Sequence, residues 1–114
     1  MKIIEYSIEK ADYKLLIETI ASEFSFNCSF SKNNISIYFK EKTIENFNFC
    51  ISIIFDYTDE NKLDVIIIYS GGKASIILKE SIYWRNLKKT INNFFIDICK
   101  KNNWKIIEKS KLKE

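Results

Sequence analysis

The side chains that could do chemistry in this chain are carboxylates, lysines, tyrosines and three thiols, because its 114 residues include no histidine. Histidine is the commonest general base and a frequent metal ligand, so its absence excludes the usual Ser-His and Cys-His nucleophilic sites and zinc hydrolases. Cys28, Cys50 and Cys99 are widely spaced and odd in number, which predicts neither a disulfide framework nor a CxxC metal pair. Each lies in an apolar run, so we expect three buried thiols.

Two glycines followed by a lysine, at 71–73, come nearest to a phosphate-binding loop. In such a loop the glycines let backbone N–H groups approach the anion, and a Ser or Thr follows the lysine. Here Ala74 follows the lysine, and Ile67 stands where the pattern requires its first glycine. We therefore interpret the glycine pair as a turn or bulge between strands.

Four carboxylates, Asp56, Asp59, Glu60 and Asp64, gather around a predicted hairpin loop. Paired acids serve glycosidic chemistry where a cleft shifts their pKa values, and an exposed loop provides no such cleft. Their spacing also lacks the pattern of an EF-hand and its glycine. We interpret them as solvated turn charges. The sequence thus predicts no catalytic residue, no metal site and no cofactor, and a protein that is not an enzyme.

The composition predicts one cytosolic domain. The chain is 46% hydrophobic and 29% charged, with two glycines and no proline, and it shows neither a linker nor an internal repeat. Its longest uninterrupted apolar run is the four residues 65–68, far short of a membrane span, and acidic residues interrupt the N-terminal segment before a secretory apolar region could form. We expect a single α+β domain over residues 1–104 and a basic tail over 105–114.

Apolar spacing predicts the elements of the first half. Residues 2–7 are β-rich, and a helical stripe follows at about Lys10–Glu23. Period-two alternation then indicates two strands joined by a two-residue Asn33-Asn34 turn, which pairs residue 30 with 37 and 28 with 39. That register puts all their apolar side chains on one face, which we expect to be the core: Phe26, Cys28, Phe30, Ile35, Ile37 and Phe39.

A longer hairpin follows over residues 47–69, and its register can be deduced. A four-residue loop would pair Phe55 with Asp64 and bring a carboxylate onto the aromatic face. A three-residue loop at 59–61 pairs Phe55 with Val65 instead, with Asn61 in the left-handed position of a bulged turn. We therefore predict the three-residue loop.

The last third predicts a long helix. Residues 74–78 are either a fifth paired strand or an edge, and a helix over about Ile82–Lys101 follows, with Ser81 as its N-cap and Asn102-Asn103 as its stop. Residues 104–107 either dock as a last strand or pin the tail to the body. The resulting order is β-α-β-β-β-β(-β)-α, an antiparallel meander with both helices on one face.

This layout is similar to the TATA-binding-protein fold and to helix-grip domains, a likeness of element order over nearly the whole chain. The segment Tyr69-Ser70-Gly71-Gly72, a strand end that closes on two glycines ahead of the terminal helix, resembles small uncharacterised bacterial domains. These resemblances imply a fold and bring no function with them.

The face of the sheet opposite the helices is the first candidate binding surface. We expect short polar side chains at its edges and aliphatic ones at its centre, and we predict a protein interface at Tyr38, Ile54, Ile66 and Ile68. The alternatives are cover by the C-terminal tail or no partner at all. Our first hypothesis is a protein-interaction domain that forms a homodimer through this face.

The basic end of the chain gives a second hypothesis. Residues 81–114 carry nine basic side chains against three acids, whereas residues 1–80 carry nine against twelve. Asn92 and the basic residues would form a face for nucleic acid or an acidic partner. The basic residues are Arg85, Lys88, Lys89, Lys100, Lys101 and Lys105. A third hypothesis is an apolar ligand in an aromatic cavity between the helices and the sheet.

Overall fold

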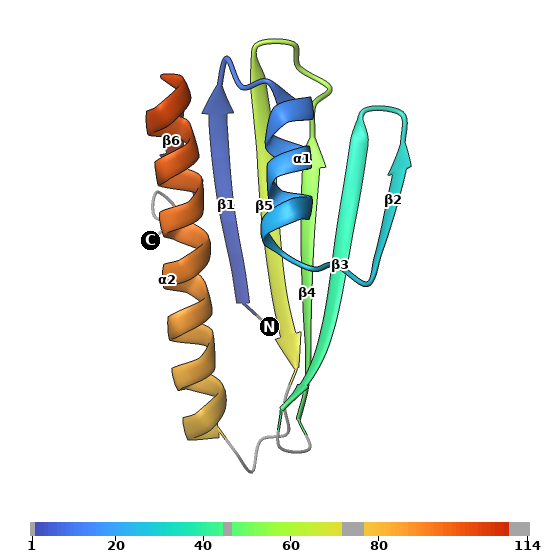
Figure 1. Cartoon of the computed structure of the whole chain (residues 1–114), viewed down its shortest axis with the longest axis vertical. Coiled ribbons are helices and arrows are strands. Elements are labelled where there is room, and N and C mark those ends of the chain that lie inside the picture. Colours follow the sequence, from blue (N-terminus) through green and yellow to red (C-terminus); the bar gives the residue numbers. More distant parts are fainter. Residues whose placement is uncertain (1, 45–46, 72–76, 110–114) are drawn as a thin grey trace.

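The computed structural model describes residues 2–44, 47–71 and 77–109. It is an α+β fold in which six antiparallel strands form one sheet in the order β2-β3-β4-β5-β1-β6, with two helices on one face (Figure 1). The elements in chain order are β1 (Lys2–Glu9), α1 (Tyr13–Glu23), β2 (Cys28–Lys32), β3 (Ile35–Ile44), β4 (Phe47–Asp56), β5 (Lys62–Gly71), α2 (Ile77–Asn102) and β6 (Lys105–Glu108). The predicted α+β class is confirmed.

The core lies between the helices and the three strands β1, β4 and β5. Alternate residues of these strands point toward the helices and are buried, as the pleat requires. Leu16 and Ile20 close this layer from α1, and Ile91, Phe95 and Ile98 close it from α2. The strand residues of the core are Ile4, Tyr6, Ile8, Phe49, Ile51, Ile53, Phe55, Leu63, Val65, Ile67 and Tyr69.

Helix α1 begins later than the predicted Lys10, at the first residue of its apolar stripe. Lys10 takes a left-handed conformation with φ 62°, and its N–H donates to the carbonyl of Asn61 at 3.1 Å, so the chain is still turning out of β1 there. Asp12 is the N-cap, and its carboxylate accepts from the N–H groups of Lys14 and Leu15 at 3.1 and 3.3 Å. The cap fixes the helix start at Tyr13, three residues after the predicted Lys10.

The hairpin of β2 and β3 has the predicted turn, but its apolar side chains lie on the face of the sheet opposite to the predicted one. Asn33 has φ 55°, and Phe30 pairs with Ile37 as expected. However, β3 pairs with β4 so that Tyr38 lies opposite the buried Ile53, which turns Tyr38 toward the helices and Ile37 away from them. The expectation of core positions is therefore wrong for the apolar side chains of β2 and β3, because pairing with β4, not alternation, decides the face, whereas Phe26, just before β2, packs against the core as expected.

The hairpin of β4 and β5 follows the predicted register, with Phe55 opposite Val65. Asn61 is not left-handed, contrary to expectation, since the described non-glycine residues with positive φ are Lys10, Asn33 and Asn103. The loop is held by side chains instead, because the Asp59 carboxylate accepts the Asn61 N–H at 2.8 Å.

Helix α2 begins earlier than predicted, at Ile77, so Ser81 lies inside it and is not an N-cap. Ile77 and Leu78 belong to this helix, which contradicts a strand over 74–78; residues 74–76, and the glycine-lysine segment after Gly71, lie outside the described residues. Asn103 stops the helix with φ 58°, as expected. Residues 105–108 then pair with β1, so docking as a last strand is the alternative that the structure bears out.

Candidate functional site: the open sheet face

The side of the sheet opposite the helices, here called the open sheet face, carries a line of apolar side chains that crosses four strands. Phe30 of β2 pairs with Ile37 of β3, Ile37 pairs with Ile54 of β4, and Ile54 pairs with Ile66 of β5. Directly paired residues share a face, so these four side chains form one continuous row. We call it the apolar row.

A second row runs beside the apolar row and is mixed in character. Its members, in the order of the strands from β2 to β1, are Cys28, Phe39, Ser52, Ile68 and Ile3. Phe39 and Ile68 extend the apolar surface along the strands, whereas Ser52 leaves a small polar gap between them. The apolar surface is therefore broadest over β3 and β5.

Exposure is greatest at the margins of this face. Phe30 is 61% exposed, Ile3 48% and Ile35 41%, whereas Ile54 and Ile66 in the centre are half-buried by their neighbours. Single exposed aliphatic residues are ordinary on a protein surface, but a paired row with flanking members is a contiguous patch.

Charged residues surround the patch with both signs. Lys32 and Glu41 are exposed at the β2 and β3 side, and Glu9 and Lys105 are exposed at the β1 and β6 side. At the end of the face beside the β4–β5 loop, the Lys109 ammonium lies 3.1 Å from the Asp64 carboxylate, and both side chains are about one third exposed. The face thus has an apolar centre with a charged rim, the arrangement typical of protein interfaces.

The structure brings together three of the four predicted interface residues. Ile54, Ile66 and Ile68 lie on the open sheet face, as expected. Tyr38 does not: it faces the helices, where its ring packs against Phe55 with centroids 5.9 Å apart. The reason is the β3–β4 register, which places Tyr38 opposite Ile53 and gives its place on the open sheet face to Ile37 and Phe39.

The same register explains what sequence reasoning missed. Phe30, Ile35, Ile37 and Phe39 were expected in the core, and the structure adds them to the open sheet face. The residues that lie on the helix side of β2 and β3 instead include Ser31 and Ser36, whose hydroxyl oxygens lie 2.9 Å apart. The helix side of β3 also carries Tyr38 and Lys40, so polar residues occur on the side that faces the helices, and alternation alone could not decide.

The cysteines also differ from expectation. Cys28 is exposed and Cys50 is half-buried, both on the open sheet face, and only Cys99 is buried. Burial raises the pKa of the Cys99 thiol to about 11, so it stays protonated at neutral pH. The described chain therefore offers two thiols as reporters of the open sheet face and one as an internal reference.

The predicted basic face divides in the structure. Arg85, Lys89 and Lys100 are exposed at helical spacing on one stripe of α2, with the 44% exposed Ile96 between them. Asn92 is not an exposed member of this face, because its side-chain oxygen accepts the Tyr6 hydroxyl at 2.7 Å.

Of the remaining predicted basic residues, Lys88 is exposed beside Arg85, three residues along α2. Lys101 instead lines a groove between the helices, and Lys105 belongs to β6. The six predicted cations are therefore divided among different surfaces.

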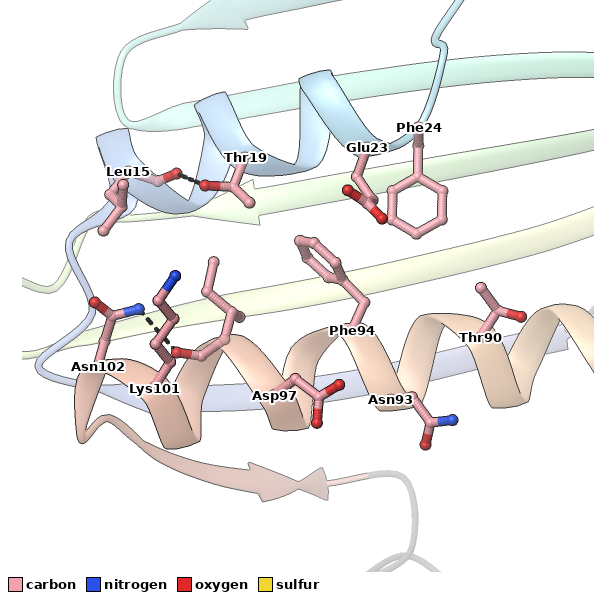
Figure 2. Close-up of a pocket in the computed structure, with 11 residues that line it drawn as sticks. Leu15, Thr19, Glu23, Phe24, Thr90, Asn93, Phe94, Asp97, Lys101 and Asn102 are labelled. Atoms are coloured by element: carbon pink, nitrogen blue, oxygen red, sulfur yellow. Dashed lines mark hydrogen bonds between the residues drawn. The ribbon is translucent and has the colours of Figure 1, made fainter.

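The expected aromatic cavity between helices and sheet is filled by the core, which leaves a space of about 40 Å³ beside Phe24 and Phe26. A larger groove of about 690 Å³ lies instead between α1 and α2 (Figure 2). The loop acids Asp59 and Glu60 are exposed, and no group of three metal-ligating side chains occurs among the residues that the structure describes.

Comparison with known proteins adds no family: neither a protein-family model nor a curated protein matches the chain. Within the described ranges, no helix combines the length and the apolar character that crossing a bilayer requires.

Proposed function

We propose that the protein is a non-catalytic, cytosolic protein-interaction domain that associates with a second copy of itself through the open sheet face. The observation that carries this proposal is the apolar row from Phe30 to Ile66, which no described element of the chain covers. Free thiols at all three described cysteines fit a reducing compartment.

The size of the face suits a second copy. Six strands about 4.8 Å apart and about eight residues long, at about 3.4 Å per residue, present a flat area of roughly 780 Å². A standard protein interface buries about 800 Å² on each partner. One sheet face against its own copy is therefore large enough for a stable dimer, provided that most of the face takes part.

The chemistry of the face also suits self-pairing. In an isologous dimer the same patch meets itself across a two-fold axis, so an apolar centre meets an apolar centre. The rim carries Lys32 and Lys105 together with Glu9 and Glu41, so each copy offers both signs of charge to the other. A rim of one sign would instead repel its copy.

The test is molar mass by light scattering over a range of concentrations, at low and high salt. The parent chain is expected at twice its 13.5 kDa mass, with little effect of salt, because the contact is mainly apolar. The double variant Ile66→Lys, Ile68→Lys should be a monomer, since each lysine would bury a charge in the contact. Ile96→Lys is the matched control, the same change at an exposed isoleucine on α2, and should leave the dimer intact.

Thiol labelling gives a second readout that does not depend on a variant. In concentrated parent protein the dimer should slow alkylation of Cys28 and Cys50, and dilution should restore it. Cys99 should stay unlabelled at either concentration, because it is buried and its pKa is raised to about 11. Unchanged labelling rates, or a monomeric parent at high concentration, contradict the proposal. A monomer that gains mass only with added nucleic acid at low salt replaces it with the basic-helix hypothesis.

A further inference from the structure

The groove between α1 and α2 is a second surface, on the opposite side of the sheet from the open sheet face. Figure 2 shows the two helices running along its two sides, with Leu15 and Glu23 reaching in from α1 and Phe94 and Lys101 from α2. Its volume of about 690 Å³ falls in the range of small-molecule sites, about 300–1,000 Å³. The lining also includes Thr19, Phe24, Thr90, Asn93, Asp97, Ile98 and Asn102.

The groove has an apolar floor that remains open to solvent. Leu15 is 41% exposed, and Phe24 and Phe94 are half-buried, although Ile98 beneath them is nearly covered. The Phe24 and Phe94 rings meet edge to face with centroids 5.4 Å apart. These rings join the two helices at one end of the groove, while Leu15 lies toward the other end.

The aromatic end of the groove is electronegative. Glu23 is the last residue of α1, whose last turn holds no basic residue, and a helix C-terminus carries a partial negative charge. No ion pair joins Glu23 to a base in the part of the chain that the structure describes. The faces of the two aromatic rings are negative as well, and Asp97 adds a second carboxylate to the lining.

The other end of the groove differs in charge. Lys101 lies there beside Asn102, whose amide donates to the carbonyl of Ile98 at 2.9 Å. An anionic group would be attracted to Lys101, and a cationic group to Glu23 and the two rings. The aromatic end provides one acid, two rings and a helix terminus, so the stronger attraction is for a cation.

We propose that this groove binds a cationic amphiphile, an alkyl chain that carries a substituted ammonium group. The ammonium lies beside Glu23 against the rings of Phe24 and Phe94, and the chain runs over Ile98 toward Leu15. The α1 side of this path, from Leu15 to Glu23, is about 12 Å long at about 1.5 Å per residue, close to the length of a decyl chain. This inference is independent of the dimer, because it uses the other side of the molecule.

The test uses three decyl probes with different heads, decyltrimethylammonium, decyl sulfate and decyl maltoside, each below its micelle-forming concentration. Binding is followed by amide chemical shifts in the Ile66→Lys, Ile68→Lys variant, so that the open sheet face does not capture the chains. Decyltrimethylammonium should bind most tightly, with shifts at Phe24, Phe94 and Ile98. Tetramethylammonium, which lacks the chain, should bind much more weakly.

Glu23→Gln should weaken binding of decyltrimethylammonium by about three- to tenfold and leave decyl maltoside unchanged, because it removes only the charge. Glu18→Gln is the matched control on the exposed side of the same helix, outside the groove lining, and should change neither. The proposal is overturned if decyl sulfate binds as well as the cation, if Glu18→Gln weakens binding as much as Glu23→Gln, or if the shifts avoid the groove.

Discussion

The two faces of the sheet differ less in composition than in what covers them. Strand β5 shows this most clearly, since the run 65–68 puts Val65 and Ile67 toward the helices and Ile66 and Ile68 on the open sheet face. Val65 and Ile67 are fully buried, whereas Ile66 and Ile68 are half-buried. A continuous apolar run is typical of a strand that is buried on both faces. The apolar residues that β5 places on the open sheet face are therefore the reason for proposing that a second copy covers it.

The covered face is held by specific packing as well as by burial. The ring centroids of Tyr6 and Phe95 lie 5.1 Å apart across the contact of β1 with α2, and those of Tyr69 and Trp84 lie 4.8 Å apart. Such contacts fix the position of α2 over β1 and β5. Among the residues that the structure describes, the apolar side chains of the open sheet face have their paired neighbours on adjacent strands and no helix packed over them, so they contribute less to the stability of the single chain.

The largest expected difference between the two faces is in the cost of removing a phenylalanine. Phe55→Ala should lower the free energy of unfolding by about 3–5 kcal/mol, because Phe55 is fully buried and its loss leaves a cavity. Phe30→Ala, at a side chain that is 61% exposed, should change it by less than about 0.5 kcal/mol in the monomeric Ile66→Lys, Ile68→Lys variant. Urea unfolding followed by circular dichroism measures both.

Equal costs at the two positions would show that the open sheet face is covered within the single chain. The comparison would then fail, and the dimer proposal would lose its premise. A second version of the experiment uses the parent chain, where Phe30→Ala should matter at high concentration and not at low concentration, because the contact it supports is between two copies.

Much of the fold could be predicted because it depends on local pairing. Asn33 tolerates a positive φ, which fixed the register of β2 with β3, and the position of Asp64 excluded the wrong loop in the β4–β5 hairpin. The start of α2 could not be predicted, because Ile77 precedes the helical stripe that begins at Trp84. Helix extension there depends on residues whose types do not distinguish helix from strand.

The candidate site was predicted for β4 and β5 and mispredicted for β3. Ile54 and Ile66 were placed correctly because their strand neighbours Phe55 and Val65 must face the helices. Tyr38 was misplaced although the pairing within each hairpin was predicted correctly. The β2–β3 hairpin can pair with β4 with either of its sides toward the helices, and the β3–β4 register determines which side that is. The groove was missed because it depends on the distance between α1 and α2, which the spacing of apolar residues along the sequence does not determine.

A smaller effect on the free energy of unfolding is expected for the polar cluster on the helix side of β3, which consists of the hydroxyl groups of Ser31, Ser36 and Tyr57. Ser36 is 3% exposed, and its hydroxyl lies 2.9 Å from that of Ser31 and 3.2 Å from that of Tyr57. Ser36→Ala should lower the free energy of unfolding by about 1 kcal/mol, because it leaves two hydroxyls without this partner. Ser52→Ala, at a half-buried serine on the open sheet face, is the matched control and should cost less than half as much. If the two variants unfold alike in urea, the cluster does not explain why β3 turns this side toward the helices.

The smallest expected effect concerns two carboxylates that lie directly opposite each other at one end of the open sheet face, Asp56 and Asp64. Like charges in this position repel each other, and a different interaction stabilises each of the two carboxylates. Asp64 pairs with Lys109 at 3.1 Å, whereas Asp56 accepts from the Thr58 hydroxyl at 2.7 Å and from the Thr58 N–H at 3.0 Å. The hydrogen bonds from Thr58 hold the pKa of Asp56 below its ordinary value.

Because the folded-state pKa of Asp56 is depressed, its contribution to stability is present above the unfolded value of about 3.9 and is lost as the pH falls through the folded one. Thr58→Val should raise the pKa of Asp56, since it removes the side-chain hydrogen bond that contributes most, while the backbone hydrogen bond remains. Carboxyl carbon NMR over an acid titration measures this directly. An unchanged Asp56 titration in Thr58→Val would show that a nearby charge, not the hydroxyl, stabilises the Asp56 carboxylate. The next variant to test would then replace Lys62.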